Sequence, residues 1–286
     1  MNSLDARIRN LGKLLAKLLL SGAALYLVFQ QIDTHQLLAH LTSANPLWLI
    51  SAVVAYNASK VLSSFRLTRY LRANDIHLSE WKNLRLYYTG MFYNLFLVGG
   101  IGGDAYKIWV LRKDPGATVK KSFQSLFFDR LNGMMSLAIL GFLFGWLAFP
   151  EAPWRNLMLA GAAASLPALY VIHRFLAPPF LSVWQPTTAL SLGVQVFQLL
   201  CAWLLLTSMG IMDHTEAYLA VFLLSSLVSI LPISIGGIGI RELVFLTAAG
   251  FSGISKDASV AFSLMFFVVT AISSLPGGFL TPLNKK

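Results

Sequence analysis

The segment LVGGIGGDAYK, residues 97–107, breaks an otherwise apolar and aromatic stretch with four glycines and a carboxylate. A lipid bilayer offers no water to the backbone of an interrupted helix, so such a break must be buried in protein or line a polar cavity. A similar break, PISIGGIGIRE, stands at residues 232–242. These two segments decide the fold that the sequence predicts.

The composition identifies an integral membrane protein. Of the 286 residues 56% are hydrophobic and only 12% charged, whereas soluble domains carry about 25% charged residues. No long polar stretch remains for a soluble domain, so we expect one membrane domain over residues 1–286. The net charge of +10 is attributed to cytoplasmic loops rather than to nucleic-acid binding, because no polar domain carries it.

Hydrophobic runs long enough to cross a bilayer of about 30 Å predict six full spans. The first follows a basic N-terminal stretch that is similar to a signal peptide, but further spans follow, so it is expected to be retained. The six predicted spans are 14–32, 46–65, 124–149, 156–176, 187–207 and 258–276.

Two other hydrophobic segments, 86–112 and 217–251, contain the glycine breaks. Each is too short for two crossings and too polar at its middle for one. We therefore expect two re-entrant hairpins, each made of two half-helices that enter and leave on the same side. The alternative is that both hairpins are full spans.

The distribution of basic residues predicts the orientation. With six spans and two hairpins, nineteen of the 22 Lys and Arg residues fall on one side. Only Arg155, Arg241 and Lys256 fall on the other. By the positive-inside rule, both termini are expected in the cytoplasm.

The two breaks resemble each other. The tetrapeptide Gly-Gly-Ile-Gly occurs at 99–102 and again at 236–239, and an acid follows each copy, Asp104 or Glu242. Three spans separate the hairpins, so they should open from opposite sides. This predicts an all-α polytopic fold with inverted repeats, about 46–149 and 187–276, as in many secondary transporters.

Glycine lets a ligand approach the backbone closely, and the half-helix that follows presents free N–H groups and a positive dipole end. The hairpin turns are therefore candidate sites for a phosphate or carboxylate. The alternative is that the glycines only permit close packing of helices.

Charged residues near these turns are further candidates, because charges at membrane depth normally face a polar interior. Asp104 is expected to cap its half-helix, with Lys107 on the same face, and Arg241 and Glu242 hold the corresponding place in the second hairpin. In the predicted third span, Asp129 and Arg130 need partners on other helices. Candidate partners are Lys107 for Asp129, and Asp104, Glu242 or a lipid phosphate for Arg130. The alternative for Arg130 is an interfacial arginine that extends to the membrane surface.

Two polar pairs stand at helical spacing, Asn57 with Lys60 and Gln195 with Gln198. Each pair either forms hydrogen bonds between helices or lines a polar pathway. Cys201 is the only cysteine and lies in an apolar segment. No His, Asp and Glu set has metal-ligand spacing, and no serine stands in a nucleophile motif. The sequence therefore predicts no catalytic residue, metal or cofactor.

Four motifs in order resemble the lysylphosphatidylglycerol synthase transmembrane-region family, also called the flippase-like domain family. They are FYNLFLVGGIGGDAYKIWVLRK, SLFFDRLNG, ILPISIGGIGIRE and SSLPGG. The matched positions are Gly99, Gly100, Gly103, Asp104, Asp129, Arg130, Pro232, Gly236, Gly237, Gly239 and Glu242.

The resemblance implies a bacterial or archaeal inner-membrane protein that moves or modifies lipids. It also implies a separate lipid-synthesising enzyme as partner, because the soluble synthase domain of the bifunctional relatives is absent here. The leading hypothesis is a lipid translocase in which the hairpins meet around a polar cavity. The alternatives are a membrane-embedded transferase with Asp104 or Glu242 as general base, and a solute transporter.

Overall fold

The predicted all-α fold is confirmed. The computed structural model describes residues 26–28, 30–31, 33–96, 102–114, 116–230 and 237–280, and these form helices and no strands. The predicted first span, 14–32, lies outside the described residues except for a few at its end.

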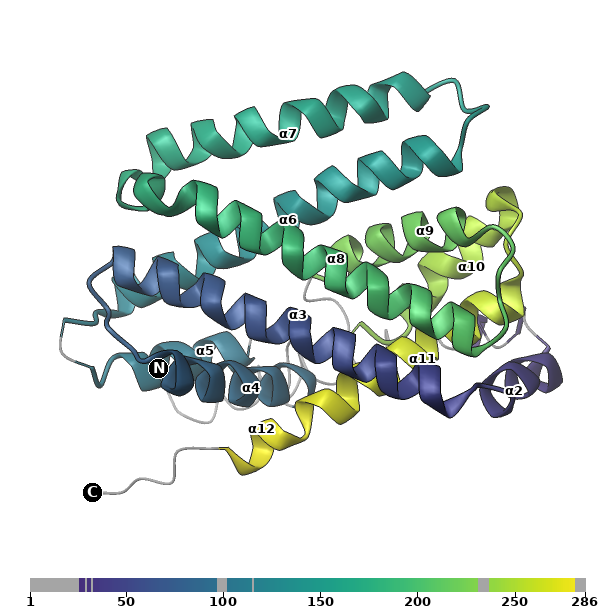
Figure 1. Ribbon diagram of the computed structural model, residues 1–286, viewed down its shortest axis with the longest axis horizontal. Coiled ribbons are helices and arrows are strands. Elements are labelled where there is room, and N and C mark those ends of the chain that lie inside the picture. Colours follow the sequence, from purple (N-terminus) through teal and green to yellow (C-terminus); the bar gives the residue numbers. More distant parts are fainter. Residues whose placement is uncertain are drawn as a thin grey trace, which may run out of the picture.

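The long helices run roughly along one axis of the molecule (Figure 1). Three short elements flank them: η1 (Pro178–Val183), a 3-10 turn that leads into α8; α2 (Thr34–Thr42), which precedes α3; and α12 (Pro276–Phe279), which follows α11. The long helices are α3 (Pro46–Ala73), α6 (Val119–Ala148), α7 (Arg155–Leu176), α8 (Trp184–Ser208) and α11 (Lys256–Ser274).

Among the described residues, four helical stretches are long and apolar enough to cross a membrane. The helices α2 and α3, which meet at 84°, together make a fifth candidate. The chain is therefore a multi-pass membrane protein, while six spans are not confirmed. The four stretches are 119–148, 155–176, 178–208 and 256–279.

The helix predicted over 46–65 is longer than the apolar run. Asn45 caps its start, with its side chain accepting from the backbone N–H of Leu47, and Pro46 fits the first turn because its missing N–H needs no partner there. The helix ends only at Ala73. The buried polar residues beyond position 65, Arg66 above all, are part of α3 and not of a loop.

Both segments with glycine breaks are interrupted helices. The first consists of α4 (Glu80–Phe96) and α5 (Gly102–Leu111), the second of α9 (Thr215–Val228) and α10 (Ile240–Ser252). Figure 1 shows the α4–α5 pair at one end of the long helices and the α9–α10 pair at the other. The predicted turn residues Gly99, Gly100, Pro232 and Gly236 lie outside the part of the chain that the structure describes.

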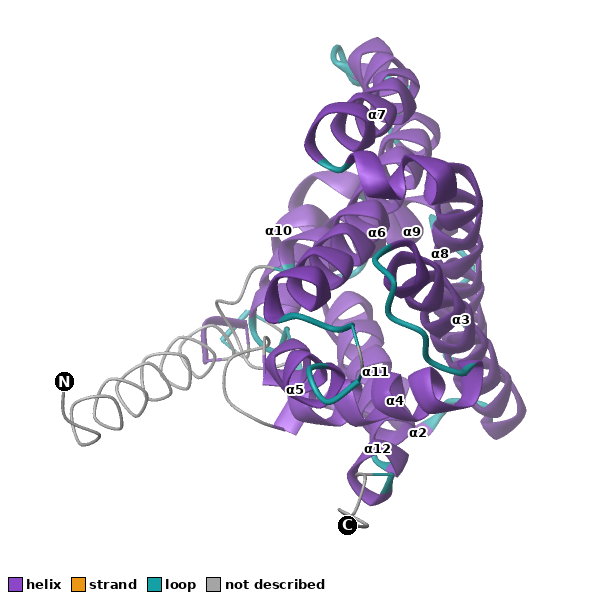
Figure 2. Cartoon of the chain, turned by 90° about the vertical axis from the view of Figure 1, so that its left-hand side faces the viewer, coloured by secondary structure: helices purple, strands orange, loops and turns teal. Residues whose placement is uncertain are grey.

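Apolar packing holds the long helices together. α3 runs alongside α8, and α7 packs against α6 at the outer edge, as the end view shows (Figure 2). The largest buried cluster joins α8, α9 and α11 and includes Leu205, Phe222 and Phe262. Each of these side chains is fully buried.

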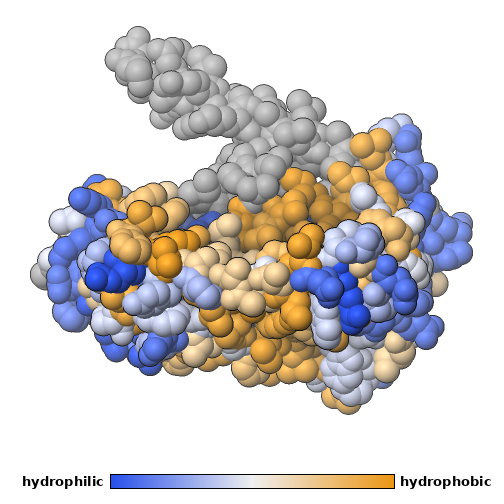
Figure 3. Space-filling view, turned by 90° about the horizontal axis from the view of Figure 1, so that it is seen from above, coloured by the Kyte–Doolittle hydropathy of each residue, from blue (hydrophilic) through white to orange (hydrophobic). Residues whose placement is uncertain are grey.

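The surface has the pattern expected of a bilayer protein. Viewed from above, hydrophobic residues gather in the middle of the long axis and hydrophilic residues at both ends (Figure 3). Large apolar side chains such as Leu157 and Leu224 are exposed on the helices. An apolar belt between polar ends matches a hydrocarbon layer between two aqueous phases.

Candidate functional site

A polar cavity lies between the two interrupted segments. It has two adjoining chambers, of about 350 Å³ and about 230 Å³, which share lining residues including Lys60, Arg130 and Gln198. We call the larger the first chamber, the smaller the second chamber, and both together the central cavity. The volume of the first chamber lies in the range of ligand pockets, about 300–1,000 Å³.

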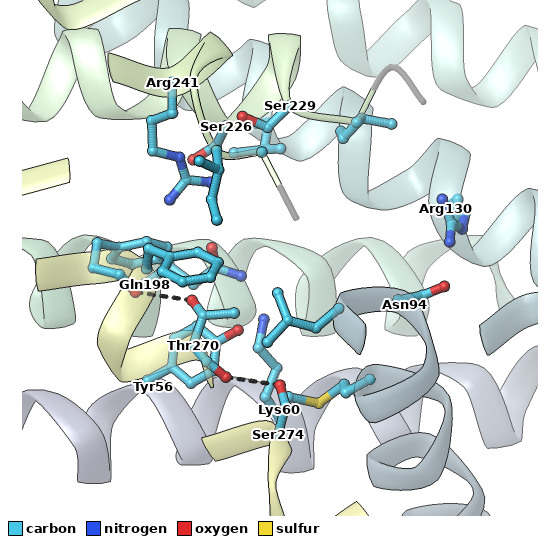
Figure 4. Close-up of a pocket in the computed structure, with 18 of the residues that line it drawn as sticks. Tyr56, Lys60, Asn94, Arg130, Gln198, Ser226, Ser229, Arg241, Thr270 and Ser274 are labelled. Atoms are coloured by element: carbon cyan, nitrogen blue, oxygen red, sulfur yellow. Dashed lines mark hydrogen bonds between the residues drawn. The ribbon is translucent and has the colours of Figure 1, made fainter. Parts of the chain in front are cut away.

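Helices from both halves of the chain form its walls. In the first chamber Lys60 comes from α3, Asn94 from α4, Gln198 from α8 and Arg241 from α10. Figure 4 shows these side chains around one hollow. Asp104 and Lys107 of α5 line the second chamber. The structure thus brings the charged ends of both interrupted segments to one cavity.

The first helix pair is held together by a close backbone approach. A Cβ built at Gly103 would overlap the carbonyl oxygen of Gly90, so α4 and α5 touch at two glycines. The side-chain oxygen of Asn94 accepts from the N–H of Gly103 at 2.9 Å, which satisfies one free donor at the start of α5. Gly103 therefore has a packing role, the alternative that the sequence left open for the glycines.

In the second helix pair, two glycines with positive φ precede α10. The backbone angle φ is +86° at Gly237 and +84° at Gly239, values that residues with a side chain rarely adopt. The buried carboxylate of Glu242 accepts from the N–H of Gly239 at 2.6 Å and from the hydroxyl of Ser263 at 2.8 Å. Glu242 thus caps its own helix and joins it to α11.

Asp104 is the centre of a charge cluster in the second chamber. Its carboxylate forms an ion pair with the guanidinium of Arg130, so Asp104 is one of the partners expected for that arginine. The ammonium of Lys107 lies 3.8 Å from the same carboxylate and 4.2 Å from the centre of the Tyr87 ring. These contacts join α4, α5 and α6.

The predicted pairing of Lys107 with Asp129 is wrong. Asp129 instead accepts from Arg66, with Nε–Oδ1 at 2.7 Å and Nη2–Oδ2 at 3.1 Å. The other terminal nitrogen of Arg66 donates to Ser191 at 2.8 Å. The planar guanidinium matches a carboxylate in this two-bond geometry, which an ammonium cannot reproduce.

The polar residues predicted to form helix contacts or to line a polar pathway do both. Asn57 bonds to Ser273 of α11 and to the Tyr88 hydroxyl of α4, so it makes helix contacts. Lys60 and Gln198 line the cavity. Gln195 lines the second chamber and its amide donates to the Gly133 carbonyl at 3.4 Å.

Sequence reasoning missed Arg66 and Ser226. Arg66 follows Ser59 and Ser63 at helical spacing, and all three are buried, so a polar stripe was readable in the sequence. Ser226 lines the first chamber from α9, where it follows Ser225 within an apolar run, and no local pattern distinguishes the two serines.

The described residues contain no group of three His, Cys, Asp or Glu side chains arranged to hold a metal ion. Cys201 is buried and its thiol is free.

Comparison with proteins of curated function finds no match. The family model for the lysylphosphatidylglycerol synthase TM region matches residues 14–183 and 180–277, which is nearly the whole chain. This multi-pass membrane protein therefore belongs to the lysylphosphatidylglycerol synthase TM-region family.

Proposed function

We propose that this protein is a lipid translocase, in which a headgroup crosses the membrane through the central cavity while its tails remain in lipid. The observation that carries the proposal is a polar cavity lined by charged side chains within a molecule whose middle is belted by apolar residues. Charges at membrane depth are costly and normally serve a substrate path.

An apolar groove beside the cavity supports a lipid as the substrate. The groove has a volume of about 250 Å³ and runs between the α6–α7 and α9–α10 helices. It shares Leu137 with both chambers of the cavity. A polar site that continues into an apolar groove suits an amphipathic molecule, because its tail stays out of water.

The α4–α5 and α9–α10 pairs act in this proposal as re-entrant hairpins that open to opposite sides, which makes the two halves of the chain inverted repeats. Their positions at opposite ends of the long helices support this (Figure 1). The excess of basic residues on one side supports an orientation with both termini in the cytoplasm. The family resemblance favours a bacterial or archaeal inner membrane as the location.

The acids that the transferase alternative would use as a general base already have partners. A general base needs a carboxylate oxygen within reach of the proton it takes. Asp104 and Asp129 are engaged by cations. Glu242 accepts through both of its oxygens.

The proposal is tested with purified protein reconstituted into sealed vesicles that carry a fluorescent phospholipid. Exchange between leaflets is followed by chemical quenching of the outer leaflet. Wild-type protein should raise the exchange rate well above that of empty vesicles, and Arg130→Ala should lower it. Arg174→Ala, which removes the same charge from an exposed position of α7, is the matched control. An exchange rate equal to that of empty vesicles would contradict the proposal.

A further inference from the structure

The charges that line the central cavity do not balance. Five basic and three acidic side chains line its two chambers, which leaves an excess of two positive charges. The basic ones are Lys60, Arg66, Lys107, Arg130 and Arg241, and the acidic ones are Asp104, Asp129 and Glu242.

Each chamber is lined by two more basic than acidic side chains, but the acids of the two chambers are engaged differently. The two aspartates lie in the second chamber, and each is engaged by an arginine. Glu242 lines the first chamber, but both its oxygens accept from neutral donors, the Gly239 N–H and the Ser263 hydroxyl. The carboxylates of the described residues are thus not paired with Lys60 or Arg241.

Lys60 and Arg241 contact aromatic rings instead of acids. The ammonium of Lys60 lies 4.3 Å from the centre of the Tyr56 ring, and the guanidinium of Arg241 lies 4.6 Å from that of Phe266. The buried Nε of Arg241 has no hydrogen-bond partner among the described residues. Cation–π contacts offset part of the cost of burying a charge but leave N–H donors available.

A hydroxyl donor accompanies the two cations. Ser226 is 9% exposed, lines the first chamber, and its Oγ has no hydrogen-bond partner among the described residues. In Figure 4 Lys60 and Arg241 extend into the hollow from opposite walls, and Ser226 lies beside Arg241. Two cations and a hydroxyl on facing walls make an anion site.

We infer that Lys60, Arg241 and Ser226 bind the phosphate group of a lipid with net negative charge. The inference rests on the proposed function and adds the substrate class. A guanidinium pairs with phosphate through two parallel bonds, and the ammonium and the hydroxyl supply further donors. A cationic headgroup would meet an excess of positive charge in the first chamber, so anionic lipids bind in preference to zwitterionic and cationic ones.

Binding is measured in detergent, where leaflet exchange plays no part, so its outcome is independent of the transport assay. Unlabelled phosphatidylglycerol, phosphatidylcholine and inorganic phosphate compete with a fluorescent short-chain phosphatidylglycerol for the full-length protein. Phosphatidylglycerol should compete at about tenfold lower concentration than phosphatidylcholine, as expected when charge-assisted hydrogen bonds to a buried site are gained.

The variants Lys60→Gln and Arg241→Gln should each remove that preference, and Arg241→Lys should retain part of it. Lys82→Gln and Arg174→Gln, at exposed positions, are the matched controls and should bind as wild type. Ser226→Ala changes the fold least and should weaken phosphatidylglycerol binding severalfold even if a charge variant fails to fold.

Equal binding of both phospholipids by the wild type, or an unchanged preference in folded Lys60→Gln and Arg241→Gln, would overturn the inference. Competition by inorganic phosphate at the same concentration as phosphatidylglycerol would overturn the assignment of the phosphate to a lipid.

Discussion

Arg66 of α3 and Asp129 of α6 form a buried ion pair with two parallel hydrogen bonds, at 2.7 Å and 3.1 Å. Removing one partner leaves the other charge buried and uncompensated. We expect Arg66→Ala or Asp129→Asn to lower the free energy of unfolding by about 3–5 kcal/mol. Thermal unfolding in detergent measures this.

A joint replacement provides the internal control for this pair. Arg66→Met combined with Asp129→Leu removes both charges, so it should recover much of the stability lost in either single variant. A double variant as unstable as the sum of the single variants would show that the pair does not act as one unit.

The contact between Gly90 and Gly103 predicts that the α4–α5 pair tolerates no side chain there. Gly103→Ala would place a Cβ against the Gly90 carbonyl oxygen, so the helices must separate. We expect a loss of more than about 1 kcal/mol in unfolding free energy. Gly250→Ala, which has open space around it in α10, should cause no loss, and equal melting temperatures for both variants would contradict this packing.

We expect Glu242 to stabilise the fold by capping the start of α10. Glu242→Gln keeps one oxygen, which can accept from the Gly239 N–H, but turns an NH2 group towards the Ser263 hydroxyl, which then loses its acceptor. The expected loss is about 1–3 kcal/mol. Ser263→Ala removes only one of the two bonds and should cost less. If Ser263→Ala is the more damaging of the two, Glu242 does not stabilise α10 in this way.

The apolar groove beside the cavity predicts an effect of side-chain size on transport. Ala138 of α6 lines the groove, so Ala138→Phe should occupy it and slow leaflet exchange severalfold. Ala163→Phe, on an exposed position of α7, adds the same side chain outside the groove and should exchange lipid like the wild type. Equal rates for the two variants would exclude the groove as the path of the tail.

The helix interruptions were predictable because glycine runs within apolar segments are local signals. The extension of α3 was not, because hydropathy treats Arg66 as a membrane-edge residue, while its burial depends on Asp129 far along the chain. The partner of Asp129 was mispredicted for the same reason.

Like the ion pair between Arg66 and Asp129, the central cavity depends on tertiary packing. Lys60 and Arg241 stand in different halves of the sequence, on α3 and α10, and only the packing of these helices brings them to one chamber. The sequence marked both residues as candidates without linking them. Whether the turn glycines at 99–100 and 236 contact a phosphate stays a prediction, since they lie outside the described residues.

The central claim, that lipid crosses through the cavity, is tested most directly by closing the cavity reversibly in one protein. A Cys201→Ala, Ser226→Cys variant is reconstituted into vesicles and modified with a bulky, water-soluble disulfide-forming reagent. Leu157→Cys, exposed on α7, serves as the control in the same background. We predict that modification at 226 stops leaflet exchange, that a reductant restores it, and that modification at 157 changes nothing; unchanged exchange with position 226 fully modified would contradict the account.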